Sequence, residues 1–574
     1  MWFLTCKRPI FGHWWVVLLA LVRSFVVFAQ SGDLGVAQQS GFVRANTRVV
    51  EVNVVVLDKK GVPIAGLTKD DFTILDSNVP QTIALFAQEG GPRSRQISKA
   101  LPSNVYTNQL DPNRVPGDVT VVLLDALNTP TEDQPFARSQ VVTLLGRLQP
   151  QDHVAIYVLN SSLYVLHDFT QDMGALIAAV QTYKLQSQTE PYPRDEAASL
   201  SAGGAPANPQ GTADPGKRAA AQAQQARQQL RDFMDTAAEK QQNMAAINRV
   251  ETTTAAFEAI ANHLASVPGR KNLVWVSGSF PVAVGLRAPS RKYSTQDAHD
   301  FEGRLERITR ALNQADIAVY PVDARGLTTS VSFDAEGPLR GEPQQGQEDT
   351  KEQDPNGFGS MDLLAERTGG RTFHNSNDLT AAVRQALVDG EISYSLAFYP
   401  SHNVWDGKYH ALKVRVDRPE AQLTYRRGYF AVAEVEQTEA EQKSALAEAV
   451  ASPINATNLT VFATLSPAIA EPTRSRDLVL TLDVHEITFF ETKGGKSCLL
   501  EFLFVQRNDA GKLLAGEEKK APLVLSEQKY DSLLKSGMVI THRLVFAQEV
   551  TEVRVVIRDQ HSGAVGSLTV PVTK

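Results

Sequence analysis

Four runs of almost uninterrupted apolar residues constrain the fold of this 574-residue chain more than any other feature. They start at Val119, His153, Asn272 and Ile317, and read VTVVLLD, HVAIYVLN, NLVWVSG and IAVYPVDARG. A strand that is apolar on both faces must be covered on both faces, as in a parallel sheet between two layers of helices. Stretches with apolar residues at helical spacing lie between the runs. We therefore expect an α/β domain over 118–390, with a mostly parallel sheet and helices on both faces.

Two shorter segments with period-two patterns flank this domain. In 46–90, Val50, Val52 and Val54 alternate with more polar residues, and 391–432 shows the same rhythm. Alternation of this kind is typical of strands with one buried face. Each segment is too short to bury a good core alone. We expect the two to pair into one β unit, with the α/β domain inserted between them and a Pro/Asn/Arg-rich connection over 91–117.

The last part of the chain returns to strand patterns after a polar linker helix over 433–456. Leu478, Leu480 and Leu482 alternate, and turn sequences such as NDAGK and HSGAVG separate further apolar stretches. Several short strands with regular turn signals are typical of a sandwich of two sheets. We expect a C-terminal β-sandwich over 457–574.

An insertion over 186–250 does not fit a compact α/β domain. Its first part is rich in Pro, Gly, Ala and Ser, which is typical of low-complexity chain. No helix breaker then occurs for nearly fifty residues, and one helix of that length would reach about 70 Å at 1.5 Å per residue. A protruding solvated helix is the favoured interpretation, and a partner-binding arm is the alternative.

The N-terminus predicts export. Lys7 and Arg8 precede an apolar run, and Ala29 ends a small-residue site suited to cleavage, so 1–29 is typical of a signal peptide followed by a polar linker over 30–45. The alternative is an uncleaved membrane anchor, which is the only case in which we expect membrane contact. Export predicts a periplasmic, envelope-associated or secreted protein.

Charge and cysteine content exclude several classes of protein. The chain has 57 Lys and Arg against 64 Asp and Glu, a net charge of −7, so no general basic surface for nucleic acid is expected. Its two cysteines, Cys6 and Cys498, exclude a disulfide framework and a cysteine-rich zinc site.

Polar residues end the apolar runs, where parallel sheets bind their ligands. The first run ends in Asp125, followed by Asn128 and Thr129, the third ends in Ser277, and the fourth ends in Asp323. Clustered carboxylate and hydroxyl oxygens are ligands that suit Mg²⁺. A structural role is the alternative, in which Asp125 and Thr129 cap a helix or bond across the loops. Thr131 with Gln134 would then form a capping box, and Asp323 would pair with Arg325.

The order of these segments resembles the von Willebrand factor A-related proteins of the acidobacterial type. VEVNVVVLDKKGVPIAGLTKDDFTILD, VVLLDALNTP, LHDFTQDMGAL, LASVPGRKNLVWVSGSF, IAVYPVDARGL and YSLAFYPSHNVWDGKYHALKVRVDRPEAQLTYRRGYF carry the resemblance over about 46–431. The resemblance implies a Rossmann-like von Willebrand factor A domain that binds proteins through a metal-ion-dependent adhesion site.

That adhesion site is degenerate here. The family pattern places Asp-x-Ser-x-Ser after the first strand, a Thr before a central helix and an Asp after the fourth strand. Asp125 matches, Leu127 stands at the first Ser, Thr129 can replace the second, and Ser277 stands at the last Asp. The resemblance therefore implies a weakened Mg²⁺ site. Its candidate ligands are Asp125, Thr129 and Ser277, with Asn128, Thr253 and Asp323 as further candidates.

Three functions remain open from the sequence. The favoured one is an exported, non-enzymatic adhesion module that binds a protein or cell-surface ligand. The second is a structural component of an envelope assembly that docks through the long helix. The third is a serine hydrolase-like enzyme with Ser277 as nucleophile, which would need His153 or His167 nearby. No His-Glu-x-x-His or Gly-x-Ser-x-Gly motif occurs, so an enzyme is not expected.

Overall fold

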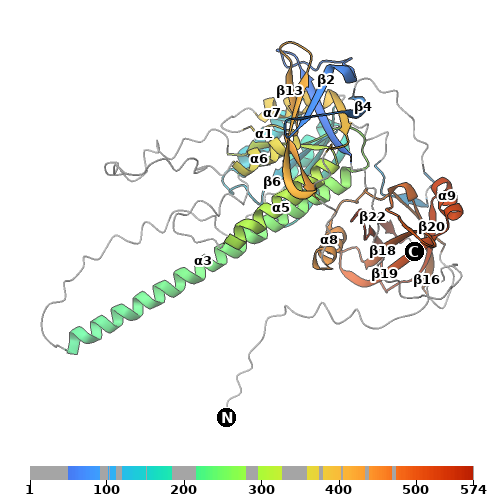
Figure 1. The fold of residues 1–574 in the computed structure, drawn as a ribbon. Helices are drawn as coiled ribbons and strands as arrows, with labels where there is room; N and C mark the ends of the chain where they lie inside the picture. Colours follow the sequence, from blue (N-terminus) through green and yellow to red (C-terminus); the bar gives the residue numbers. More distant parts are fainter. Residues whose placement is uncertain are drawn as a thin grey trace.

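A computed structural model describes the molecule (Figure 1). It covers residues 49–90, 101–102, 104–110, 119–149, 152–183, 215–278, 295–325, 359–373, 379–401, 405–432, 439–467 and 474–572. The expected signal peptide (1–29) and linker (30–45) lie outside these residues, as does the low-complexity part of the insertion. Within the described ranges, no helix combines the length and apolar character needed to cross a bilayer.

The four apolar runs form neighbouring strands of one five-stranded sheet. The strands are β6 (Val119–Asp125), β7 (His153–Leu159), β8 (Leu163–Thr170), β9 (Lys271–Ser277) and β10 (Ile317–Asp323). Their order is β10-β9-β6-β7-β8, and all neighbours are parallel except β7 and β8. The expectation of a mostly parallel sheet is confirmed, and the carboxyl ends of β6, β9 and β10 lie at one edge.

Helices cover both faces of this sheet. Alternate residues of β6 explain why, since Val121 and Leu123 lie in one hydrophobic core and Val122 lies in another. The first core includes residues of α3, α5 and α6, and the second includes residues of α1, α2 and α7. The helices are α1 (Gln134–Leu145), α2 (Met173–Thr182), α3 (Pro215–Leu264), α5 (Thr295–Gln314), α6 (Gly359–Thr368) and α7 (Leu379–Glu391).

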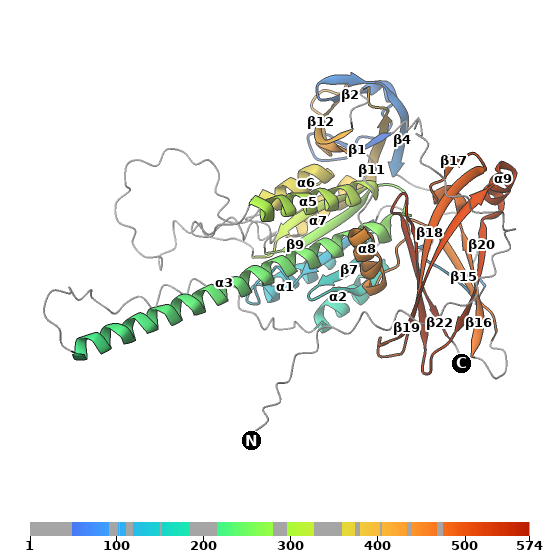
Figure 2. The same cartoon turned by 60° about the horizontal axis from the view of Figure 1, so that its bottom comes forward.

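Helix α3 is continuous over 50 residues and has two different halves. Its C-terminal half buries Phe257, Ile260 and Leu264 against the sheet. Its N-terminal half projects away from the rest of the molecule (Figures 1 and 2). The side chains of Phe233 and Met244 on that half are 71% and 59% exposed. The boundary expected at residue 250 therefore falls inside a single helix.

Segments from both sides of the α/β domain build one β unit. β1 (Val50–Leu57) lies between β11 (Ile392–Phe398) and β13 (Gln422–Tyr425), with β4 (Ile83–Gly90) beyond β11. A second sheet has the order β14-β12-β2-β3, with β14 (Gly428–Val432), β12 (Asp406–Val416), β2 (Phe72–Asp76) and β3 (Val79–Gln81). The 3-10 helix η1 (Lys69–Asp71) precedes β2. Both sheets bury their apolar side chains in one core.

The C-terminal part also contains two antiparallel sheets that share one core. One has the order β20-β16-β15-β5, with β20 (Met538–Val545), β16 (Ser475–Leu482), β15 (Val461–Leu465) and β5 (Val105–Thr107). The other is β17-β18-β21-β22, with β17 (Phe490–Thr492), β18 (Gly495–Arg507), β21 (Glu552–Asp559) and β22 (Val565–Pro571), and β19 (Leu513–Leu525) pairs with β18. Three short helices accompany them: α8 (Glu439–Ala451), η4 (Val484–Glu486) and α9 (Glu527–Ser536).

Strand β5 comes from the 91–117 segment, which we expected to be only a connection. It pairs with β15. The Thr107 hydroxyl donates to the carbonyl of Val461, which lies 354 residues later in the sequence. The amide of Asn108 secures it, because Nδ2 donates to the carbonyls of Ala456 and Leu459 and Oδ1 accepts from the N–H of Val461. The chain therefore contributes to the C-terminal sheets before it enters the α/β domain.

Candidate functional site

Asp125 lies at the carboxyl end of β6 and is the centre of a buried polar cluster. Its Oδ2 accepts hydrogen bonds from the Trp275 indole and the Ser277 hydroxyl, both at 2.9 Å. Its Oδ1 accepts from the N–H of Asn128 at 2.9 Å. Trp275 and Ser277 are two residues apart on β9, so their side chains leave the same face of that strand. The neighbouring strands β6 and β9 thus bring acceptor and donors together.

Asn128 connects this carboxylate to helix α3. Its Nδ2 donates to Asp125 Oδ2 at 2.8 Å and to the hydroxyl of Thr253 at 2.9 Å. The Thr253 hydroxyl in turn donates to the carbonyl of Arg249, one turn earlier. Only the nitrogen of the Asn128 amide can donate to both partners. Asp125, Asn128 and Thr253 are all buried, with side chains at most 2% exposed.

Thr129 fastens the loop after β6 to the loop after β9. Its hydroxyl donates to the carbonyl of Asp125 and accepts from the N–H of Gly278 at 3.0 Å. Gly278 is required at this contact, because a Cβ there would lie 2.9 Å from Cδ of Pro130. The two loop ends therefore pack too closely for any other residue at this position.

Burial raises the pKa of Asp125 above its usual range. The hydrogen bonds from Asn128, Trp275 and Ser277 favour the ionised form and act against this rise. Oδ2 accepts three of the four hydrogen bonds and Oδ1 accepts one, and all four donors belong to residues of the protein itself. The cluster has the character of a structural hydrogen-bond network.

These residues do not fit Mg²⁺ as they are arranged. The ion needs about six oxygens in octahedral geometry at 2.0–2.1 Å. Here a single carboxylate is present, and the nitrogen of Asn128 lies between Asp125 and Thr253, where a cation would bridge them. Across the described ranges, no three His, Cys, Asp or Glu side chains are grouped so that they could hold a metal ion.

The structure brings together five of the six candidate ligands. Asp125, Asn128, Thr129, Ser277 and Thr253 all belong to the cluster. Asp323 at the end of β10 does not, because its Oδ1 accepts from the N–H and the Nε of Arg325 at 2.9 and 3.0 Å. The ion pair of Asp323 and Arg325, which was the structural alternative for these residues, is therefore present.

Two expectations about this region need correction. The capping box of Thr131 and Gln134 is wrong, because Asp133 is the N-cap of α1. The amide of Gln134 turns back instead and donates to the carbonyls of Ala126 and Thr129. Sequence reasoning also missed Trp275 as a member of the cluster. Its position two residues before Ser277 on a strand was the signal that could have found it.

Comparison with known proteins gave distant structural likenesses. No protein-family model matches the chain, and no curated protein does. An aerotolerance-related membrane protein from Bacteroides fragilis is 12% identical over 47% of this chain and 98% of its own, with a TM-score of 0.24. BatB from Bacteroides thetaiotaomicron is 14% identical over 48% and 98%, with a TM-score of 0.23. The ArnB paralog VWA2 from Sulfolobus acidocaldarius is 9% identical over 92% and 75%, with a TM-score of 0.21. TM-scores this low do not place the chain in the family of any of the three.

Proposed function

We propose that the chain is an exported, non-enzymatic protein-binding or adhesion module with a degenerate von Willebrand factor A-like domain. One observation carries the proposal. The Asn128 nitrogen, which bonds Asp125 at 2.8 Å and Thr253 at 2.9 Å, takes the place that an adhesion metal would need. The domain would then bind a protein or cell-surface ligand through ion-independent contacts.

The topology supports this interpretation of the α/β domain. A mostly parallel sheet with one antiparallel edge strand lies between two helix layers, and an aspartate ends its central strand β6. The two C-terminal sheets with a shared core support a β-sandwich over 457–574. The resemblance of the sequence to von Willebrand factor A-related proteins adds to both.

The setting of the candidate nucleophile supports binding rather than catalysis. The Ser277 side chain is fully buried, and its hydroxyl donates to Asp125. The ring of His167, one of the two histidines that a serine hydrolase would need, contacts the carbonyl of Asp168 through Nδ1 at 2.7 Å. A nucleophile must reach its substrate, and this serine is held away from solvent.

Thermal unfolding with and without divalent cations tests the proposal. We expect Mg²⁺ or Mn²⁺ in excess over EDTA to leave the melting temperature of the wild-type chain unchanged, because a ligand that does not bind cannot stabilise. Asp125→Asn keeps the shape of the side chain and serves as the matched variant. A cation-dependent rise in wild type that is absent from Asp125→Asn would overturn the proposal.

Export is tested separately. We propose cleavage after Ala29, on the strength of Lys7, Arg8 and the apolar run that follows them. N-terminal sequencing of the protein recovered from the cell envelope or the medium should start at Gln30. A chain that starts at Met1 and remains with the membrane fraction would show an uncleaved anchor instead.

A structural role in an envelope assembly is the second candidate. The observation that favours it is the exposure of Phe233, Met234 and Met244 on the projecting half of α3, at 71%, 61% and 59%. Deletion of 219–245 should then remove partners that cross-link to the wild-type chain in the envelope. An unchanged set of cross-linked partners would contradict this role.

A further inference from the structure

The projecting half of α3, residues 215–247, exposes large apolar side chains, and we call it the arm (Figures 1 and 2). Phe233, Met234 and Met244 are 71%, 61% and 59% exposed, whereas Val250, where α3 enters the α/β domain, is 1% exposed. Helices in proteins gain most of their stability from packing of an apolar face. Several large apolar side chains exposed on one element indicate an interaction surface.

Contacts at the other end of α3 fix the direction of the arm. The carbonyl of Asn262 accepts from the N–H of Thr457 at 2.8 Å, and the ring of His263 contacts the carbonyl of Asn455 through Nδ1 at 2.7 Å. These bonds join the helix to the chain that leads into the C-terminal sheets. A helix that is held in this way presents its exposed face without further ordering, which lowers the entropic cost of association.

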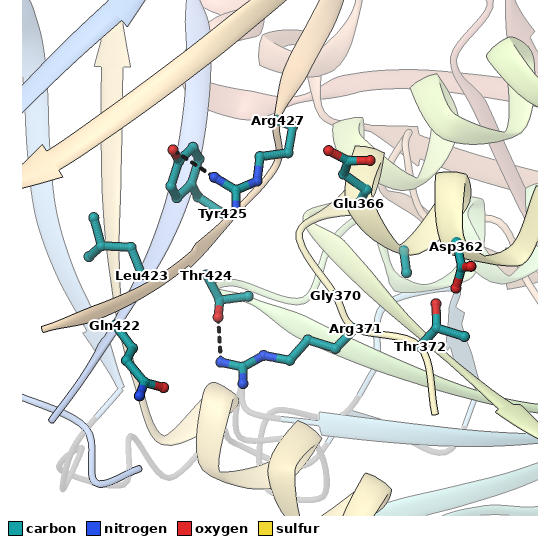
Figure 3. Close-up of a pocket in the computed structure, with 11 residues that line it drawn as sticks. Asp362, Glu366, Gly370, Arg371, Thr372, Gln422, Leu423, Thr424, Tyr425 and Arg427 are labelled. Carbon is teal, nitrogen blue, oxygen red and sulfur yellow. Dashed lines mark hydrogen bonds between the residues drawn. The ribbon is translucent and has the colours of Figure 1, made fainter. Parts of the chain in front are cut away.

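The groove between α6 and β13 belongs to the same support. Arg371 crosses it and donates to the Thr424 hydroxyl at 2.5 Å, which joins the α/β domain to the first β unit (Figure 3). Segment 370–372, which carries this arginine, is held against β10, because a Cβ on Gly370 would lie 1.8 Å from the carbonyl oxygen of Val319. The domain from which the arm projects is therefore braced by its neighbours.

The apolar residues of the arm follow one line along the helix. Phe233, Ala237 and Met244 are spaced by four and seven residues, which is the heptad spacing of a helix that packs along another helix. In the sequence, further apolar residues continue this spacing toward the N-terminus: Leu230, Ala226, Ala223 and Ala219. All these positions fall within about 100° of the helix circumference, as expected of a stripe that faces a partner. The bulky residues lie toward the base of the stripe, and alanines lie toward its tip.

The charges of the arm are separated along its axis. Residues 217–231 contain four basic residues and no acidic one: Lys217, Arg218, Arg227 and Arg231. Residues 232–239 contain three acidic residues and no basic one: Asp232, Asp235 and Glu239. A second arm running in the same direction would place like charges side by side, whereas one running in the opposite direction places each basic stretch beside an acidic stretch. At the spacing of packed helices, about 8–10 Å, salt screens such charges only in part.

We propose that two copies of the chain pair through their arms, as an antiparallel pair of helices. The register that fits both patterns lays 217–231 of one copy beside 232–246 of the other, so that opposite charges meet. Facing positions on the stripe are then Leu230 with Phe233, Ala226 with Ala237, and Ala219 with Met244. The interface is two-fold symmetric, because each arm contributes the same surface.

This register also fits the length of the arm. The paired stretch 219–244 spans about 39 Å at 1.5 Å per residue. The tip of each arm then reaches the base of the other, since Met244 is still exposed and Val250 is buried in the α/β domain. The two α/β domains lie at opposite ends of the pair. The inference goes beyond both candidate functions, because contact between copies needs neither an adhesion ligand nor another envelope protein.

The mass of the purified exported chain in solution tests the pairing. By multi-angle light scattering at micromolar concentrations, we expect twice the mass of one chain. Phe233→Lys places a charge on the stripe and should give the mass of a single chain. Gln228→Lys is the matched control, because Gln228 lies on the opposite side of the arm and bonds Asp232, which lysine can also do. A monomeric wild type, or equal masses of the two variants, would overturn the proposal.

Cross-linking tests the direction and the register without disturbing the stripe. Ala226→Cys and Ala237→Cys are made in separate chains, mixed, and oxidised after exchange. The native Cys498 is buried and should not compete. We expect cross-linked dimers in the mixture and not in either variant alone, because position 226 faces position 237. Cross-linking of each variant with itself would show parallel arms, and no cross-link in the mixture would exclude this register; either result would overturn the proposal.

The outcome can be told apart from that of the candidate functions. A monomeric chain whose arm still cross-links to other envelope proteins would overturn the pairing and leave the assembly role in place. A dimer that keeps its set of other envelope partners after deletion of 219–245 would support the pairing and contradict that role. The effect of divalent cations on the melting temperature is independent of both.

Discussion

The side-chain nitrogen of Asn128 lies 2.9 Å from the hydroxyl of Thr253, although 125 residues separate them in sequence. This bond joins the loop after β6 to helix α3, and through Asp125 it continues to β9. Buried polar networks of this kind fix loop positions strongly, because a buried polar group that loses its hydrogen-bond partner costs folding free energy.

The energy of this contact can be measured with a double-mutant cycle. Asn128→Ala and Thr253→Val each remove one partner, and Val keeps the shape of Thr. We expect the two losses in unfolding free energy to be non-additive by about 1–2 kcal/mol in urea denaturation. A matched cycle of Asn128→Ala with Thr252→Val, whose hydroxyl bonds Asn248, should be additive. Additivity in both cycles would contradict the bond.

Stability should depend on pH through Asp316. Burial raises the pKa of this carboxyl to about 6, with Glu51 and Glu89 adding to the rise and Lys271 and Arg426 opposing it. Because the folded state holds the proton more tightly, unfolding free energy falls as pH rises from about 4 to 6, by up to about 3 kcal/mol. Asp316→Asn should flatten this part of the profile.

Asparagine suits the site for a second reason. Asp316 has a φ of +52°, and asparagine tolerates the left-handed region as aspartate does. Asp70→Asn, at an exposed position, is the control and should leave the profile unchanged. Chemical denaturation at pH 4, 5, 6 and 7 measures it. Parallel profiles for wild type and Asp316→Asn would be the contrary result.

Two glycine substitutions should have opposite effects. Gly370→Ala would place a Cβ 1.8 Å from a backbone oxygen of Val319, so the segment must move, and we expect a loss of about 2–4 kcal/mol. Gly303→Ala, exposed in α5 with nothing within 4 Å of its Cβ, should gain about 0.5–1 kcal/mol. Melting curves of the two variants test this pair. A neutral Gly370→Ala would show that the segment is not held as described.

Asn108→Ala should weaken the attachment of β5. It leaves the carbonyls of Ala456 and Leu459 and the N–H of Val461 without their partner, at a cost of about 2–4 kcal/mol. Hydrogen exchange at the Val461 amide should become faster. Gln109→Ala, which removes only a long 3.4 Å bond to the Thr460 hydroxyl, is the control and should change this exchange much less. Unchanged exchange at Val461 would show that Asn108 does not hold this edge.

The mostly parallel sheet was predictable because its strands are apolar on both faces, and each apolar run in the sequence shows this directly. Strand β5 was not, because Val105–Thr107 is three residues long and has no pattern of its own. It is a strand only because β15 lies beside it. Partners that are distant in sequence leave no local signal.

The location of the candidate site was predictable from the sequence, whereas the roles of its residues were not. The rule that parallel strands end at one edge brings Asp125 and Ser277 together, as the structure does. The role of Asn128 depends on which atom of its amide meets Thr253, and spacing in sequence cannot fix that. The sequence makes Asp323 a candidate ligand, but Arg325, two residues later, bonds Oδ1 of its carboxylate.

The position of β5 has a consequence for the order in which the protein can be completed during synthesis. Residues 105–107 leave the ribosome early, whereas β15, their partner at 461–465, follows more than three hundred residues later. Asn108 must likewise wait for Ala456 and Leu459. A C-terminal fragment made alone would lack this strand and expose the edge of β15 to other chains. The C-terminal sheet is therefore complete only when β5, a strand from near the start of the chain, pairs with β15.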